Sequence, residues 1–101
     1  MINKIEVSPL AEKEIEESFN WYEKEAEGLG IRFILSIDDA VNNIAEKPET
    51  YPKKKSNIRQ YVVEDFPFVI VFEYIRANRL INILHVFHTS RNPKLKYKRK
   101  A

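Results

Sequence analysis

The sequence predicts an α+β domain in which two N-terminal helices pack on an antiparallel sheet, in the order β-α-α-β-β-β. Two observations support this prediction. Apolar residues recur every three or four positions over residues 9–47, as on the buried face of a helix. After residue 57, short apolar and β-branched runs alternate with polar turns, as in successive strands. We expect residues 1–101 to form one domain, with a basic tail at residues 94–101.

The first half of the chain contains clear signals for the ends of its elements. Residues 2–7 are rich in β-branched side chains and form a strand candidate. Ser8 and the proline after it mark a helix start, because serine is a favoured N-cap and proline fits the first turn. Gly28 and Gly30, the only two glycines, predict the turn that ends this helix. A second helix follows and ends at Pro48, so the two should form an antiparallel hairpin.

The second half of the chain reads as a polar loop followed by strands. The loop is predicted over residues 48–57, which are polar and contain two prolines. Three strands are predicted after it, over residues 58–63, 68–74 and 80–87. The last two are apolar on both faces, although one helical layer can cover only one face of the sheet. Uncovered apolar surface of this kind is typical of a partner-binding protein.

Charge is distributed unevenly along the chain. Residues 1–52 carry five Lys/Arg and twelve Asp/Glu, whereas residues 53–101 carry twelve Lys/Arg and three Asp/Glu. This split suggests a basic face that meets phosphates or an acidic protein, or else acidic helices that only balance a basic sheet. No apolar run approaches the roughly 18 residues of a membrane span. With no cysteine and no apolar leader, we expect a cytoplasmic protein without a metal site or cofactor.

Five segments, taken in their order and spacing, resemble a known group of proteins. They are SPLAEKEIEESFNWYEKE, KPETYP, the isolated Ile58-Arg59 pair, FPFVIVFEY and ILHVFHTSRNP. Together they resemble the RelE/ParE superfamily, the toxins of type II toxin–antitoxin pairs, and within it the ParE-like plasmid stabilization members. The resemblance implies a cognate antitoxin that covers apolar and basic surfaces of the toxin, in a hetero-oligomer or beside a homodimer. It also implies one of two targets, since ParE-like members inhibit DNA gyrase and RelE-like members cleave mRNA on the ribosome.

A metal-independent ribonuclease needs a general base, a general acid and cations beside the phosphate. His88 is the candidate acid or base, and Arg59 and Arg91 are the candidate phosphate ligands. Two of them have a structural alternative: His88 could bond the backbone at a strand end, and Arg59 could pair with the acidic residues 64–65. His85 is expected to be a partly buried structural residue.

The sequence favours the non-enzymatic alternative, a ParE-like inhibitor that binds gyrase or a similar target. RelE-like ribonucleases place an arginine early in the strand predicted at 68–74, where this chain has Phe68 and Val69. For such an inhibitor, the candidate target- or nucleic-acid-binding residues are basic or aromatic: Lys53, Lys54, Lys55, Arg91, Lys94, Lys96, Tyr97, Lys98 and Arg99. A non-toxic module that binds nucleic acid or protein is the further alternative.

Overall fold

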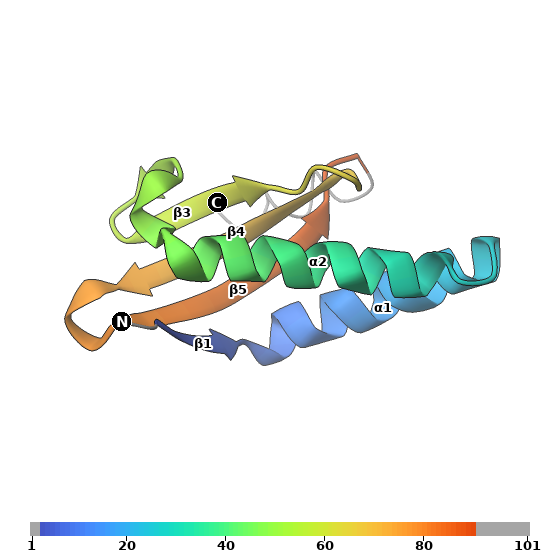
Figure 1. Cartoon of the computed structure of the whole chain (residues 1–101), viewed down its shortest axis with the longest axis horizontal. Coiled ribbons are helices and arrows are strands. Elements are labelled where there is room, and N and C mark those ends of the chain that lie inside the picture. Colours follow the sequence, from blue (N-terminus) through green and yellow to red (C-terminus); the bar gives the residue numbers. More distant parts are fainter. Residues whose placement is uncertain (1–2, 91–101) are drawn as a thin grey trace.

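The computed structural model describes residues 3–90 of the chain. Two helices form a layer on one face of a five-stranded sheet (Figure 1). They are α1 (Pro9–Glu25) and α2 (Leu29–Glu46), and they run antiparallel, joined by a short turn (Figure 1). The predicted helical hairpin and the α+β class are therefore confirmed.

The sheet is mixed rather than fully antiparallel. Its strands are β1 (Lys4–Val7), β2 (Lys53–Lys55), β3 (Ile58–Val62), β4 (Phe68–Ile75) and β5 (Leu80–His88), in the spatial order β1-β5-β4-β3-β2. The β1 strand pairs parallel with β5, and all other pairs are antiparallel. Two short 3-10 helices, η1 (Pro48–Thr50) and η2 (Arg76–Asn78), precede β2 and β5.

The prediction of a plain loop over residues 48–57 is wrong, because this stretch contains η1 and the edge strand β2. Three consecutive lysines show no apolar alternation, so nothing local indicates a strand there. The strand is defined by its pairing with β3, where Lys53 lies opposite Arg59.

Ser8 joins the start of α1 to β5. Its Oγ accepts a hydrogen bond from the Ala11 amide at 3.0 Å, as an N-cap does, and donates to the Leu84 carbonyl at 3.1 Å. Its own amide donates to the Ile83 carbonyl at 2.9 Å. One serine therefore caps the helix and fixes its first turn against the sheet.

The turn between the helices is closed by Glu23. Gly28 adopts a φ of +86°, in the left-handed region that favours glycine. Because Gly28 has no side chain to cap α2, the Glu23 carboxylate does so, accepting the Gly28 and Gly30 amides at 2.8 Å each. Gly30 lies so close to α1 that an added Cβ would be 2.8 Å from the Phe19 carbonyl oxygen.

The core lies between the helical layer and the sheet. An aromatic cluster of Tyr22, Phe33, Phe66 and Phe68 joins α1 and α2 to β4, with ring centroids 4.8–6.2 Å apart. The largest fully buried side chains come from α2, β4 and β5: Phe33, Ile44, Phe68, Ile70, Phe72, Ile81, Ile83 and Val86. Edge and tilted ring packing of this kind adds to the stabilisation from burial alone.

The opposite face of the sheet is less open than the sequence predicts. Val69 and Phe87 lie opposite one another in β4 and β5 and are only 8% and 6% exposed. Val62 in β3, by contrast, is 70% exposed. The expectation of a broad uncovered apolar face is therefore wrong for the centre of the sheet and holds at the β3 edge.

Candidate target-binding surface

His88 is the last residue of β5 and lies opposite Phe68 in β4. The imidazole is half-buried and packs edge-on to the Phe68 ring at 5.2 Å between centroids. Its Nδ1 accepts a hydrogen bond from the Ser90 amide at 3.0 Å. The ring orientation is thus fixed, and any proton transfer by His88 would use Nε2.

Arg59 in β3 binds the backbone next to it. Its Nη1 donates to the Tyr51 carbonyl at 2.9 Å and to the Glu49 carbonyl at 3.3 Å. Within residues 3–90 the guanidinium therefore contacts these carbonyls rather than the carboxylates of residues 64–65. Arg59 fastens η1 and the start of β2 to the sheet.

Arg59 and His88 are not brought into one site. Arg59 lies opposite Phe72 on one side of β4, and His88 lies opposite Phe68 on the other side. With about 3.4 Å per residue along a strand and about 4.8 Å between strands, the two backbones are about 17 Å apart. The third ribonuclease candidate, Arg91, lies outside the described residues.

The lysines of β2 form a cationic strand at one edge of the sheet. Lys53, Lys54 and Lys55 are all exposed. Lysines on an edge strand oppose uncontrolled pairing with other strands and leave their charges available to an anionic partner. The remaining predicted binding residues lie outside the described part of the chain: Lys94, Lys96, Tyr97, Lys98 and Arg99.

A pocket of about 530 Å³ beside β2 and β3 was not predicted from the sequence. It is lined by Asn43, Tyr51, Pro52, Lys54, Gln60, Tyr61, Val62 and Glu64. The Tyr51 and Tyr61 rings pack edge-on at 4.9 Å, and the Asn43 side-chain amide donates to the Tyr61 hydroxyl at 2.9 Å. Burial, followed by the nearby Tyr61 and Glu46, raises the pKa of the Tyr51 phenol. The pocket brings together three separate stretches of the chain, at residues 43, 51–54 and 60–64, and no local motif marks it.

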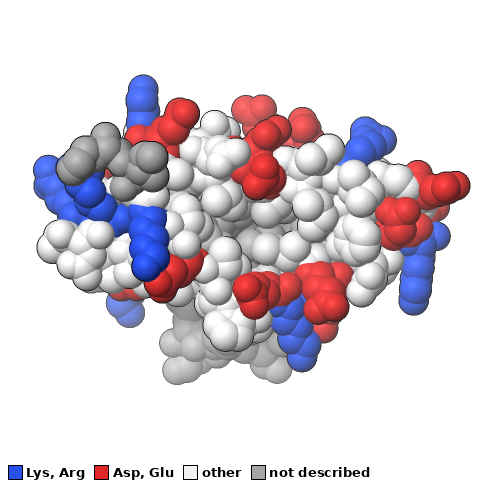
Figure 2. Space-filling view, turned by 60° about the horizontal axis from the view of Figure 1, so that its bottom comes forward, with Lys and Arg blue, Asp and Glu red and all other residues white. Residues whose placement is uncertain are grey.

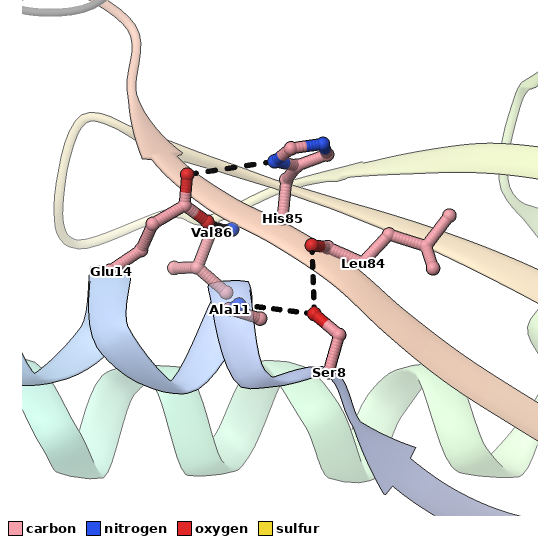
Figure 3. A network of polar contacts seen from close by, with 6 residues as sticks. All are labelled: Ser8, Ala11, Glu14, Leu84, His85 and Val86. Atoms are coloured by element: carbon pink, nitrogen blue, oxygen red, sulfur yellow. Dashed lines mark hydrogen bonds and ion pairs between the residues drawn. The ribbon is translucent and has the colours of Figure 1, made fainter.

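Glu14 is a second residue whose role the sequence does not reveal. Its Oε1 accepts a hydrogen bond from the Val86 amide at 2.7 Å, at the edge of β5 beyond the end of β1 (Figure 3). Its Oε2 lies 3.5 Å from His85 Nδ1 (Figure 3). The His85 side chain is 25% exposed, which confirms the expectation of a partly buried position.

The face that carries α1 and β1 has charged side chains of both signs around an uncharged central area, as Figure 2 shows. Two large apolar side chains of α1, Leu10 and Trp21, are 43% and 44% exposed.

Within residues 3–90, no cluster of His, Asp and Glu could hold a metal ion, and neither helix is long and apolar enough to cross a membrane.

Comparison with known proteins places this fold in a family. A family model described as "ParE toxin of type II toxin-antitoxin system, parDE" matches residues 5–93. A chain of the chromosomal ParDE TA system from P. aeruginosa aligns with a TM-score of 0.71 and 15% identity, covering 85% of this chain and 95% of that one. The isolated E. coli RelE toxin aligns with a TM-score of 0.55 and 12% identity, covering 98% of this chain and 99% of that one. Comparison with curated proteins gives no match. Because the family model spans most of the sequence, the chain belongs to the ParE toxin family, within the RelE/ParE superfamily.

Proposed function

We propose that this chain arrests bacterial growth by binding an essential cytoplasmic target, DNA gyrase or a similar enzyme, and that a cognate antitoxin neutralises it. Membership of the ParE family supports a toxin with an antitoxin partner. The choice of a binding mechanism depends on one further observation, the separation of Arg59 from His88.

That separation weakens the ribonuclease alternative. Phosphate-stabilising cations act only when they lie within hydrogen-bond distance of the reacting phosphate, near the acid and base. The backbones of Arg59 and His88 are about 17 Å apart by strand geometry. Its guanidinium is engaged by the Glu49 and Tyr51 carbonyls. An inhibitor that only binds its target needs no such constellation.

The first test is controlled induction in bacteria, with thymidine and amino-acid incorporation followed from the first minutes. We expect thymidine incorporation to fall first, because a gyrase inhibitor stops replication before protein synthesis. An early fall in amino-acid incorporation would instead support mRNA cleavage on the ribosome. Normal incorporation of both would contradict a toxin and favour a non-toxic binding module.

The second test uses purified gyrase and a DNA supercoiling assay with matched charge variants. Replacing Lys53, Lys54 and Lys55 by serine removes three cations from the β2 edge. The control replaces Lys13, Lys24 and Arg32, which are exposed on the helices, by serine, so that the net charge changes equally. We expect the β2 triple variant to weaken inhibition by about tenfold or more and the control to change it by less than about twofold. Equal loss in both variants would mean that net charge, not the β2 edge, mediates binding.

A further inference from the structure

The β1 strand forms the outer edge of the sheet on the side away from β2. It is the terminal strand in the order β1-β5-β4-β3-β2, and its one neighbour among the described strands is β5 (Figure 1). Within residues 3–90, no strand therefore lies along its outer side. The outer side of an edge strand presents unpaired backbone groups, which can pair with a strand of another chain.

This edge is held in place by the core and by one polar side chain. Ile5 and Val7 pack against the core from the inner face of β1. Just before the strand, the Asn3 side-chain amide donates to the Ala45 carbonyl at 2.8 Å, and its Oδ1 accepts a hydrogen bond from the Tyr74 hydroxyl at 3.3 Å. A strand that is already fixed in this way loses little further conformational freedom when it pairs.

The backbone groups of Ile5 and Val7 point to the open edge. The amides of Lys4 and Ser8 donate to carbonyls within residues 79–83, at 2.8 Å and 2.9 Å, and so point toward β5. Neighbouring residues of a strand direct their N–H and C=O groups to opposite edges. Two N–H groups and two C=O groups, those of Ile5 and Val7, therefore face outward in strand register.

The two exposed side chains of β1 carry opposite charges. Lys4 and Glu6 share one face of the strand, are 74% and 55% exposed, and lie 3.8 Å apart between Nζ and Oε2. A lysine on an edge strand opposes pairing with most other strands. It does not oppose a strand that places a carboxylate directly across from it. A cation and an anion two positions apart are complementary to the same two charges in reverse order, as in an antiparallel copy of β1.

One antiparallel register satisfies both the backbone and the charges. Outward groups must face outward groups, so the two-fold axis must pass through a residue. An axis through Ile5 places each Lys4 opposite Glu6 of the second copy. An axis through Glu6 or Lys4 places like charges directly opposite one another, which destabilises the pair. An axis through Val7 places Ile5 opposite Pro9, which has no N–H to donate.

We infer that two copies of this chain associate through β1, antiparallel and centred on Ile5, so that their two sheets join into one. The two Ile5 residues exchange a pair of N–H···O=C bonds, and Lys4 and Glu6 form two cross-strand charge pairs. The inference does not depend on the proposed function. Because β2 is the opposite edge of the sheet, both lysine strands stay open to a target, about 43 Å apart at about 4.8 Å per strand.

Sedimentation equilibrium of the full chain tests for this association. The paired edge is short, so we expect a Kd on the order of 10–100 µM. Between about 5 µM and about 500 µM, the average mass should rise from near one copy toward two. Hydrogen exchange at the Ile5 amide should slow by about threefold or more over this range. The Glu6 amide, which points toward β5, should change by less than about twofold.

Charge variants test the register. Lys4→Glu places carboxylates opposite each other and Glu6→Lys places ammonium groups opposite each other, so each should weaken association by about tenfold or more. Lys13→Glu and Glu17→Lys, at exposed positions of α1, change the net charge by the same amounts and should alter association by less than about threefold.

Two combinations should restore association. The double variant Lys4→Glu with Glu6→Lys exchanges the two charges, so opposite charges again face each other, and its Kd should return to within about threefold of the wild type. A mixture of the two single variants should form a heterodimer, because each glutamate of one copy then faces a lysine of the other. Circular dichroism and thermal unfolding check that each variant is folded.

Several results would overturn the inference. A chain that stays monomeric up to about 500 µM has no such interface. A dimer that persists equally in Lys4→Glu and Glu6→Lys is held by another surface, and folded single variants that do not associate when mixed contradict the register. If a single variant does not fold, the double variant and exchange at the Ile5 amide of the wild type decide instead. A monomeric double variant, or an exchange rate independent of concentration, then rejects the β1 interface.

Discussion

The carboxylate of Glu14, in α1, accepts a hydrogen bond at 2.7 Å from the amide of Val86, in β5, across 72 positions of sequence. The β1 strand pairs with β5 only as far as Ile83, so among residues 3–90 no strand lies beside the outer edge of β5 beyond that point. Glu14 and Ser8 bond to the backbone there in place of a strand. The first helix thus protects an edge that would otherwise be open to other chains.

The first prediction follows from this contact. Glu14→Ala leaves the partly buried Val86 amide without its acceptor and should lower the free energy of unfolding by about 1–3 kcal/mol. Glu14→Gln keeps an acceptor oxygen and should cost less. Urea unfolding measures both, with Glu17→Ala as the control on an exposed position of the same helix. Equal effects of Glu14→Ala and Glu17→Ala would show that the contact does not stabilise the fold.

The second prediction concerns the turn between the helices. A Cβ on Gly30 would lie 2.7 Å from Glu23 Oε1 and 2.8 Å from the Phe19 carbonyl oxygen. Gly30→Ala should therefore destabilise the chain by about 1–3 kcal/mol, since a backbone atom must move. Gly28→Asn should cost less, because a Cβ added at Gly28 would meet no other part of the chain within 4 Å and asparagine accepts a positive φ. Thermal unfolding measures both variants. If Gly28→Asn lowered the melting temperature more than Gly30→Ala, the close approach of Gly30 to α1 would not matter for stability.

The third prediction separates a structural Arg59 from a functional one. Arg59→Ala removes the guanidinium that binds the Glu49 and Tyr51 carbonyls, and the free energy of unfolding should fall by about 1.5–3 kcal/mol. Arg32→Ala, on an exposed position of α2, should change it by less than about 0.5 kcal/mol. Denaturant unfolding and the growth assay are done on the same variants. Unchanged stability with lost toxicity would instead indicate a direct role at the target.

The fourth prediction concerns alkaline pH. The pKa of the Tyr51 phenol is raised by burial and by its neighbours, so the folded chain disfavours the phenolate. The unfolded chain ionises near the usual pKa of about 10, and the stabilisation is therefore complete below that pH and lost as pH rises through the folded pKa. Tyr51→Phe removes this dependence. Urea unfolding between about pH 8 and about pH 11 should show a stability difference between the two chains that is constant at first and then shifts against the wild type.

Local signals were sufficient to predict the helices. The Ser8 cap, the two glycines and the regular apolar spacing all act within a few residues of one another, so a single sequence contains them. The strands at residues 58–63, 68–74 and 80–87 were predicted from their apolar runs and the turns between them. These features place the chain in its fold class before any long-range contact is known.

The features missed by the sequence analysis depend on contacts between distant segments. The β2 strand exists because β3 pairs with three lysines that have no strand pattern of their own. The role of Glu14 depends on an amide 72 positions away. Arg59 is recognisable as a cation in the sequence, but its carbonyl partners depend on how η1 turns beside β3. The pocket beside Val62 requires three separate stretches of the chain to be placed together.

The parallel pairing of β1 with β5 has a consequence for the timing of synthesis. Lys4 lies opposite Leu80, and β5 also pairs with β4, so the last described strand is inserted between the first strand and the rest of the sheet. A nascent chain whose residues 80–88 have not yet left the ribosome lacks β5, the strand that pairs with both β1 and β4. Contacts of such large sequence separation form late and slowly. The toxin can therefore fold only after its last described strand has been translated. During this delay, an antitoxin that is already present can meet each new molecule.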